Sequence, residues 1–296
     1  MSEPESVGAR VLSPHASELG EGPVYDPIDD TLWWFDILGK TLIEHRFATS
    51  ETKVHELPFM ASAMGLVDAD HHLIAAEDGL YLRRIGDGNL ALVAPVEADN
   101  PATRSNDGRA HASGAFWTST MGREFETGAG SIYWFCRGEV RRLFSGLTVP
   151  NSICFSPDGT TAYFTDSRAH VLHRVAIDPA TGLPTGEPEM FNDHRGKKGA
   201  QDGTVCDVDG LLWNACNGMG RLDVYAPDGR RVRSIALPVS RVTCPAFLGE
   251  KADRIAMTTA KEGLSPEERE READAGRTFL LDIGVRGRLE PRVALG

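Results

Sequence analysis

The chain has 296 residues, of which 31 are Lys or Arg and 43 are Asp or Glu, so its formal net charge is −12. This acidic balance repels nucleic-acid phosphates and anionic lipid surfaces, which excludes nucleic acid and membrane as expected partners. Hydrophobic residues make up 41% and charged residues 25%, a composition typical of a globular protein.

The termini and the cysteines point to an intracellular protein. No apolar run approaches the roughly 20 residues that a membrane-spanning helix needs, and the first 15 residues lack the apolar core of a secretion signal. The chain has 5 cysteines, an odd number without a CxxC pair, which favours reduced thiols over a disulfide framework. We therefore expect a cytoplasmic location and free thiols at Cys136, Cys154, Cys206, Cys216 and Cys244.

One short pattern recurs six times along the chain: a turn rich in Asp and Gly, a strand of apolar and β-forming residues, and then a small polar residue. In chain order the copies occupy residues 26–37, 68–79, 111–122, 156–167, 207–218 and 249–260. One apolar anchor per copy recurs every 41 to 49 residues, at Leu32, Leu73, Phe116, Tyr163, Leu212 and Ile255. A propeller blade of four strands takes about 40–50 residues.

The period therefore predicts an all-β, six-bladed β-propeller, and the residues described below place a central metal site in it. We expect residues 1–296 to form one domain, with a flexible segment over residues 1–10. A β-sandwich is the alternative, but it gives no reason for one motif to recur six times at a near-constant period. One helix is predicted over residues 265–275, because Ser265 suits the N-cap and Pro266 and Glu267 suit the first turn. It is almost wholly polar, so we expect it on the surface.

Oxygen-bearing residues stand 10 to 12 positions before every anchor, in the strand that precedes the turn. In a propeller, equivalent residues of successive blades converge on the central channel, and converging buried carboxylates need a cation. Carboxylate and amide oxygens suit Ca²⁺ or Mn²⁺ and are tolerable for Zn²⁺. Taken singly, each could be an ordinary turn residue, but four in phase predict a bound cation: Glu21, Asn106, Asn151 and Asp202. The other two copies contribute the oxygen-bearing Ser62 and Thr243.

Other catalytic signatures are absent from the sequence. It has no GxSxG elbow, P-loop, HExxH or GxGxxG motif, and its 9 histidines form no ligand-spaced cluster. His71 and His72 fall in a predicted hairpin turn, where we expect them to be exposed. We expect the tryptophans within strands, Trp33, Trp34 and Trp213, to lie in the core.

Several motifs together resemble the senescence marker protein (regucalcin) / gluconolactonase / luciferin-regenerating enzyme-like family. They are GEGPVYD, RSNDGR with TSTMGRE, VPNSICFSPDG with YFTDS, and QDGTVCDVDGLLWNACNGMGRL, followed by PAFLGEKADRIAMTTAKEG and EADAGRTFLLDIGVRG. The resemblance runs in order over residues 15–290. It implies a six-bladed propeller with one metal ion in the central channel.

By this resemblance the metal ligands are Glu21, Asn151 and Asp202, and Asp202 is also the candidate catalytic base. The residues implied to contact substrate are Arg104, Asn106 and Glu124. The cofactor is one divalent cation, with Ca²⁺ first and Zn²⁺ or Mn²⁺ as alternatives. The implied enzyme is a hydrolase of carboxylic esters, a metal-dependent lactonase that opens an aldonolactone such as gluconolactone to the sugar acid.

Two departures from the family leave the substrate open: a compact segment after Met121 and a basic loop at residues 195–198. The loop contains Arg195, Lys197 and Lys198. It suggests lactones of acidic sugars, and the alternative is an ordinary solvated surface loop. The alternatives to a lactonase are a phosphotriester or aryl-ester hydrolase on the same scaffold and a non-enzymatic Ca²⁺-binding propeller. We expect a small-molecule sugar lactone as the partner, and a monomer or weak homo-oligomer.

Overall fold

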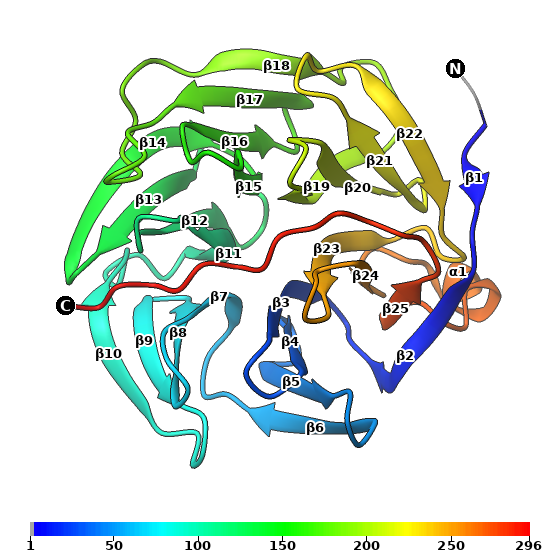
Figure 1. The fold of residues 1–296 in the computed structure, drawn as a ribbon, viewed down its shortest axis with the longest axis horizontal. Helices are drawn as coiled ribbons and strands as arrows, with labels where there is room; N and C mark the ends of the chain where they lie inside the picture. Colours follow the sequence, from blue (N-terminus) through cyan, green and yellow to red (C-terminus); the bar gives the residue numbers. More distant parts are fainter. Residues whose placement is uncertain (1–2) are drawn as a thin grey trace. The chain divides into compact units, whose positions relative to one another are not determined.

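The computed structural model describes residues 3–296, which form six β-sheets, one for each copy of the repeat (Figure 1). All the pairings are antiparallel except that of β1 (Glu5–Ser6), which adds to one sheet in parallel beside β22. The predicted all-β, six-bladed propeller class is confirmed. The residues group into two compact units, unit 1 with Met1–Glu56 and Gly196–Leu289 and unit 2 with Leu57–Arg195 and Glu290–Gly296. The single domain predicted for residues 1–296 stays a prediction.

Unit 1 contains three of the sheets. The first is β3 (Gly20–Asp26), β4 (Thr31–Asp36), β5 (Thr41–Arg46) and β6 (Glu51–Glu56). The second is β19 (Ala200–Cys206), β20 (Leu212–Asn217), β21 (Arg221–Tyr225) and β22 (Arg231–Ala236), joined by β1. The third is β23 (Val242–Leu248), β24 (Arg254–Thr259) and β25 (Arg277–Leu281), completed by the N-terminal strand β2 (Ala9–Ala16).

Unit 2 contains the other three sheets. They are β7 (Ala61–Leu66), β8 (His71–Ala76), β9 (Gly79–Arg84) and β10 (Leu90–Pro95); then β11 (Thr103–Ala110), β12 (Phe116–Gly122), β13 (Gly130–Cys136) and β14 (Glu139–Leu147); and finally β15 (Pro150–Phe155), β16 (Thr161–Asp166), β17 (Val171–Ala176) and β18 (Glu189–Asp193). In all six sheets the predicted anchor lies in the second strand.

Burial falls from the first strand of a sheet to the last. Every residue of β11 and of β15 is buried, whereas β14 and β18 are exposed or half-buried throughout. A buried first strand would be expected to be apolar, yet β11 contains Arg104, Asn106 and Asp107. Buried polar groups need hydrogen-bond partners, so this strand is a place to look for a functional site.

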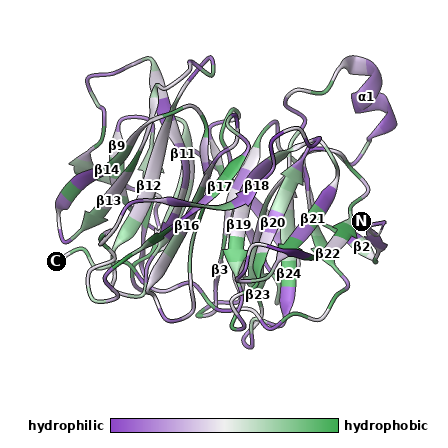
Figure 2. Cartoon of the chain, turned by 90° about the horizontal axis from the view of Figure 1, so that it is seen from above, coloured by the Kyte–Doolittle hydropathy of each residue, from purple (hydrophilic) through white to green (hydrophobic). Residues whose placement is uncertain are grey.

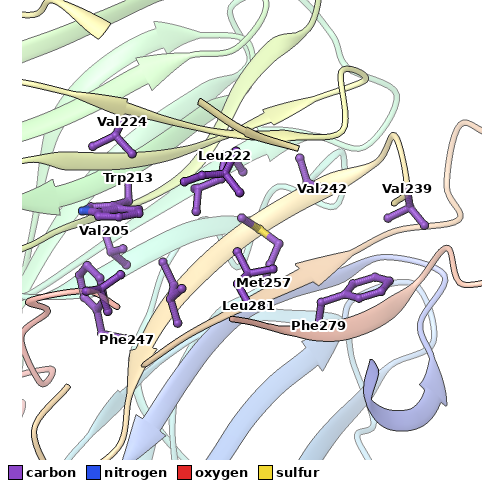
Figure 3. Close-up of a cluster of buried hydrophobic side chains, with 14 of the residues drawn as sticks. Val205, Trp213, Leu222, Val224, Val239, Val242, Phe247, Met257, Phe279 and Leu281 are labelled. Carbon is purple, nitrogen blue, oxygen red and sulfur yellow. The ribbon is translucent and has the colours of Figure 1, made fainter. Parts of the chain in front are cut away.

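The core of unit 1 is built from side chains of neighbouring sheets (Figure 3). Trp213 on β20 meets Phe247 on β23 edge to face, with ring centroids 6.3 Å apart. Trp33, Trp34 and Trp213 are all buried, as predicted. The thiols are free, also as predicted, and four of the five are buried. Apolar packing of this kind is the main stabilising contribution in a small all-β unit.

The predicted helix is present but shorter than expected. α1 spans Pro266–Arg271, and Ser265 and Glu268 form a capping box at its start. It has no buried residue, and Figure 2 shows it largely in the hydrophilic colour. Without an apolar face to pack, only local bonds support it, and such short helices end early. Within residues 3–296 no helix is both long and apolar enough to cross a bilayer.

Two local expectations differ from the structure. Residues 1–10 were expected to be flexible; residues 1–2 lie outside the described part, but Glu5–Ser6 pairs with β22 and β2 begins at Ala9. His71 and His72 were both expected to be exposed in a hairpin turn. Strand β8 begins at His71, so its alternation leaves His71 half-exposed and turns His72 fully inward.

Candidate metal and substrate site

Each of the six predicted oxygen-bearing positions lies in the first strand of a different sheet. In every case the pairing with the second strand shifts register at that position or directly after it, as a β-bulge does. A bulge bends the strand and re-aims a side chain away from the regular alternation. A β-bulge in the first strand therefore sets the direction of each of these side chains: Glu21, Ser62, Asn106, Asn151, Asp202 and Thr243.

In unit 2, three of the predicted site residues are joined by hydrogen bonds. The Arg104 Nη1 donates to Asn106 Oδ1 at 3.0 Å, and Asn106 Nδ2 donates to Asn151 Oδ1 at 3.2 Å. Asn106 Nδ2 also donates to the Pro150 carbonyl at 2.9 Å. All three side chains are buried. The structure thus brings together Arg104, Asn106 and Asn151 from β11 and β15.

This chain of bonds fixes which way each amide points. A guanidinium has only donors, so Asn106 must turn its oxygen toward Arg104 and its nitrogen toward Asn151. Asn151 then presents its oxygen to Asn106, and its nitrogen donates to Ser167 Oγ at 3.1 Å. Asn151 Oδ1 is therefore held as an acceptor, which is the orientation that a metal ligand requires.

Asp107 and Arg109 reinforce the same junction between β11 and β15. Asp107 Oδ2 accepts from the Ile153 N–H at 2.7 Å, and Arg109 Nε donates to the Ile153 carbonyl at 3.0 Å. Arg109 also pairs with Glu290 of the C-terminal segment. Burial raises the pKa of Asp107 to about 6, against the opposing effects of Arg109 and of the backbone donors Ile153 and Gly108. We assign Asp107 a structural role in joining the two strands.

In unit 1, Asp202 is held in a similar manner. Asn217 Nδ2 donates to Asp202 Oδ2 at 2.8 Å, and Arg241 Nη1 donates to Asn217 Oδ1 at 3.3 Å. The donor-only guanidinium again sets the direction of an amide, which then orients the carboxylate. Asp202 is buried in β19. Glu21 in β3 is half-buried, and its Oε2 accepts from the N–H of Gly22, whose φ of +56° suits glycine.

Glu124 differs from the other predicted residues. It lies in the exposed turn that follows β12, and its backbone N–H donates to Glu126 Oε2 at 3.1 Å. The register of β11 with β12 pairs Arg104 with Met121 and Thr103 with Gly122. Glu124 therefore belongs to the turn at the Arg104 end of this sheet.

Two residues that help to orient Asn151 and Asp202, Ser167 and Asn217, were not predicted. Ser167 follows β16 directly and Asn217 is the last residue of β20. Both stand at the end of their copy of the repeat, where the pattern has a small polar residue, so the sequence contained a signal. In the basic loop at residues 195–198, Arg195 donates to both carboxylate oxygens of Asp193, at 2.9 and 2.7 Å, so its charge is paired within the chain.

The predicted metal ligands offer oxygen donors only, two carboxylates and one amide. This set fits a hard cation such as Ca²⁺, which binds carboxylate and amide oxygens. Glu21 and Asp202 belong to unit 1 and Asn151 to unit 2. Between Glu3 and Gly296, no three His, Cys, Asp or Glu side chains form a metal-ligand cluster. The predicted set contains only two residues of those types.

Comparison with known proteins agrees with the resemblance. Residues 19–261 match the SMP-30/Gluconolactonase/LRE-like region. A Rhizobium meliloti protein with the provisional name sugar lactone lactonase is 47% identical, over 97% of each chain. The pentonolactonase of Haloferax volcanii is 32% identical, over 93% of this chain and 94% of its own.

A solved structure extends this similarity over the whole fold. It is the crystal structure of regucalcin, a calcium-binding protein from Agrobacterium tumefaciens, with 47% identity, a TM-score of 0.98 and full coverage of both chains. The family match and these relatives cover nearly all of the sequence that carries the repeat and the bulged site positions. The chain therefore belongs to the SMP-30/gluconolactonase/LRE-like family.

Proposed function

We propose that this protein is a sugar lactonase, a carboxylic-ester hydrolase that opens an aldonolactone ring to the sugar acid. The observation that carries the proposal is the buried chain of hydrogen bonds from Arg104 through Asn106 to Asn151. These bonds orient the guanidinium of Arg104 on β11 and the amide oxygen of Asn151 on β15, two strands in which every residue is buried. The lactonases among the relatives support the same reaction.

The second part of the proposal is one divalent cation held by Glu21, Asn151 and Asp202. It is supported by their equivalent positions on bulged first strands and by their oxygen donors. Ca²⁺ is the first choice, consistent with the calcium-binding relative, and Zn²⁺ or Mn²⁺ are alternatives. When bound, such a cation polarises the lactone carbonyl and stabilises negative charge on its oxygen.

The residues of the chain supply the remaining steps. Arg104 binds and orients the lactone through its guanidinium N–H groups, Asn106 positions that guanidinium, and Glu124 accepts hydrogen bonds from sugar hydroxyls. Asp202 takes a proton from the attacking water, and Asn217 holds the carboxylate in place for this transfer. The acyl carbon–ring oxygen bond then breaks, and the proton passes from Asp202 to the leaving alkoxide. The products are a free hydroxyl and a carboxylic acid, which releases its own proton to solvent at neutral pH.

The test is hydrolysis of D-glucono-1,5-lactone by the wild type and by Asp202→Ala. Loss of the general base is expected to lower kcat by about 10²–10⁴-fold. Asp228→Ala, in an exposed turn where Asp228 pairs with Arg230, is the matched control and should keep full activity. Wild-type turnover in a folded Asp202→Ala variant would contradict the assignment.

The same assay separates the other functions that the sequence left open. Faster turnover of phosphotriesters or aryl esters than of any lactone would indicate a different hydrolase. Calcium binding without turnover of any ester would indicate a non-enzymatic protein. The cytoplasmic location and the monomeric or weakly oligomeric state stay predictions.

A further inference from the structure

An exposed aromatic residue in a disfavoured backbone conformation lies next to Glu124. Phe125 has a φ of +61°, in the left-handed region that bulky residues rarely adopt, and 39% of its surface is exposed. Its N–H donates to the Gly122 carbonyl at 3.1 Å, which closes the turn after β12. Strain of this kind at an exposed aromatic, with no core to fill, points to a functional use of the ring.

Arg168 lies over the ring of Phe125, with its Cζ 5.0 Å from the ring centroid. Its backbone is fixed, because its N–H donates to Asp166 Oδ1 at 3.1 Å. In the part of the chain that the structure describes, however, no carboxylate pairs with its guanidinium. The N–H groups of a guanidinium point outward from its edge. An arginine stacked on an aromatic face can therefore still donate hydrogen bonds to an anion.

Other stacked arginines in this protein do not share that feature. Arg141 stacks on Trp134, Arg233 on Trp213 and Arg254 on Phe47. Each of these three guanidinium groups also lies within ion-pair distance of a carboxylate, from Glu139, Glu5 and Asp30 respectively. In a chain with a net charge of −12, a stacked guanidinium with no carboxylate beside it is a specific local feature.

Arg168 and Phe125 lie at the ends of their two sheets that also contain Asn151 and Arg104. Arg168 follows Ser167, whose hydroxyl holds Asn151, and β15 pairs with β16 so that Asn151 faces Thr165 near this end. Phe125 belongs to the turn at the Arg104 end of its sheet. All these residues belong to unit 2. The stacked pair therefore lies at the same end of these two sheets as Arg104 and Asn151.

We propose that Arg168, held in place by Phe125, is a specificity-determining residue that binds a carboxylate on the substrate. The preferred substrate is then the lactone of an acidic sugar, with a second carboxyl group beyond the ring. The basic loop suggested selectivity for the lactones of acidic sugars. We assign that selectivity to Arg168, because Arg195 already forms an ion pair with Asp193. The inference rests on the proposed lactonase function.

The test compares D-glucaro-1,4-lactone with D-glucono-1,4-lactone, which share a ring and differ in a carboxylate against a hydroxymethyl group. The measured quantity is the ratio of their kcat/KM values at neutral pH, corrected for spontaneous hydrolysis. We expect the wild type to prefer the glucarolactone. Arg168→Gln should lower the ratio by about tenfold, as expected for loss of one charge-assisted contact at a partly solvated site. Arg168→Lys should lower it less, because a charge remains without the planar fork.

Two further variants keep the test specific. Phe125→Gly suits the left-handed backbone and should still lower the ratio several-fold, since it removes the platform under Arg168. Arg254→Gln is the matched control, an equally stacked arginine whose partner Leu248 lies at the opposite end of β23 from Thr243, and it should leave the ratio unchanged. A ratio that does not change in folded Arg168→Gln, or a wild type that prefers gluconolactone, would overturn the inference while lactonase activity stood. Inactivity on every lactone would overturn the proposed function and this inference with it.

Discussion

Replacement of Ser167 by alanine is expected to weaken cation binding although Ser167 is not itself a proposed ligand. Ser167 Oγ accepts the hydrogen bond that holds the Asn151 amide nitrogen, at 3.1 Å. Without it, the buried nitrogen of Asn151 either stays without that partner or turns toward another. Turning moves Asn151 Oδ1 away from the position that Arg104 and Asn106 impose.

The size of the effect follows from these contacts. A hydrogen bond between neutral buried groups contributes about 0.5–1.5 kcal/mol, and an unsatisfied partner costs about 1–3 kcal/mol. Since 1.4 kcal/mol is about tenfold in affinity, the cation should bind about 10- to 100-fold more weakly, the usual range for residues that orient a ligand. Stability should fall by about 1 kcal/mol.

The assay is a calorimetric titration of Ca²⁺ into chelator-treated protein. Ser156→Ala is the matched control, because Ser156 follows β15 at the end opposite to Asn151 and its hydroxyl forms a different hydrogen bond, donating to Asp158 at 2.6 Å. That variant should bind Ca²⁺ as the wild type does. Wild-type affinity in Ser167→Ala would refute the view that the Asn151 amide is oriented for a cation.

Three other predictions concern catalysis, packing and acid stability. Asn217→Ala should lower kcat by about tenfold in steady-state assays, with less change in KM, because Asp202 loses a 2.8 Å hydrogen bond. Trp117→Ala should lower the free energy of unfolding by about 3–5 kcal/mol in denaturant titrations, since this fully buried ring would leave a cavity. Burial alone would raise the pKa of Glu44, but hydrogen bonds from His55 and Arg46 outweigh it and lower the pKa to about 2. The ionised carboxylate therefore stabilises the fold above pH 4.5 and loses this effect on acidification, by about 2 kcal/mol at pH 3; Glu44→Gln should show a smaller loss between pH 7 and pH 3.

The repeat made much of the fold predictable. The six anchors fall in the second strands because turn, strand and polar residue recur with a fixed phase, and an alternating pattern leaves little choice of face. The same phase placed the oxygen-bearing residues in the first strands. Their register shifts were not predicted, because a bulge depends on the pairing of two strands and not on one strand's pattern.

Features that depend on distant partners were also missed. Ser167 and Asn217 stand at a recognisable polar position of the repeat, but their hydrogen bonds to Asn151 and Asp202 depend on how two strands pair, which the pattern of one strand does not specify. The short pairing of Glu5–Ser6 with β22 joins segments far apart in the sequence. His72 is buried because β8 begins at His71, two residues earlier than a turn at both histidines would allow. Helix α1 ends before residue 275 because no apolar side chain anchors a further turn.

The central claim is that hydrolysis of the lactone depends on one bound divalent cation. Its most direct test is the rate of D-glucono-1,5-lactone hydrolysis by full-length protein after chelation, with metal content checked by elemental analysis, before and after Ca²⁺ is returned. The account predicts that activity disappears on chelation and returns as one equivalent of cation binds. Full activity in protein shown to be free of metal would contradict it.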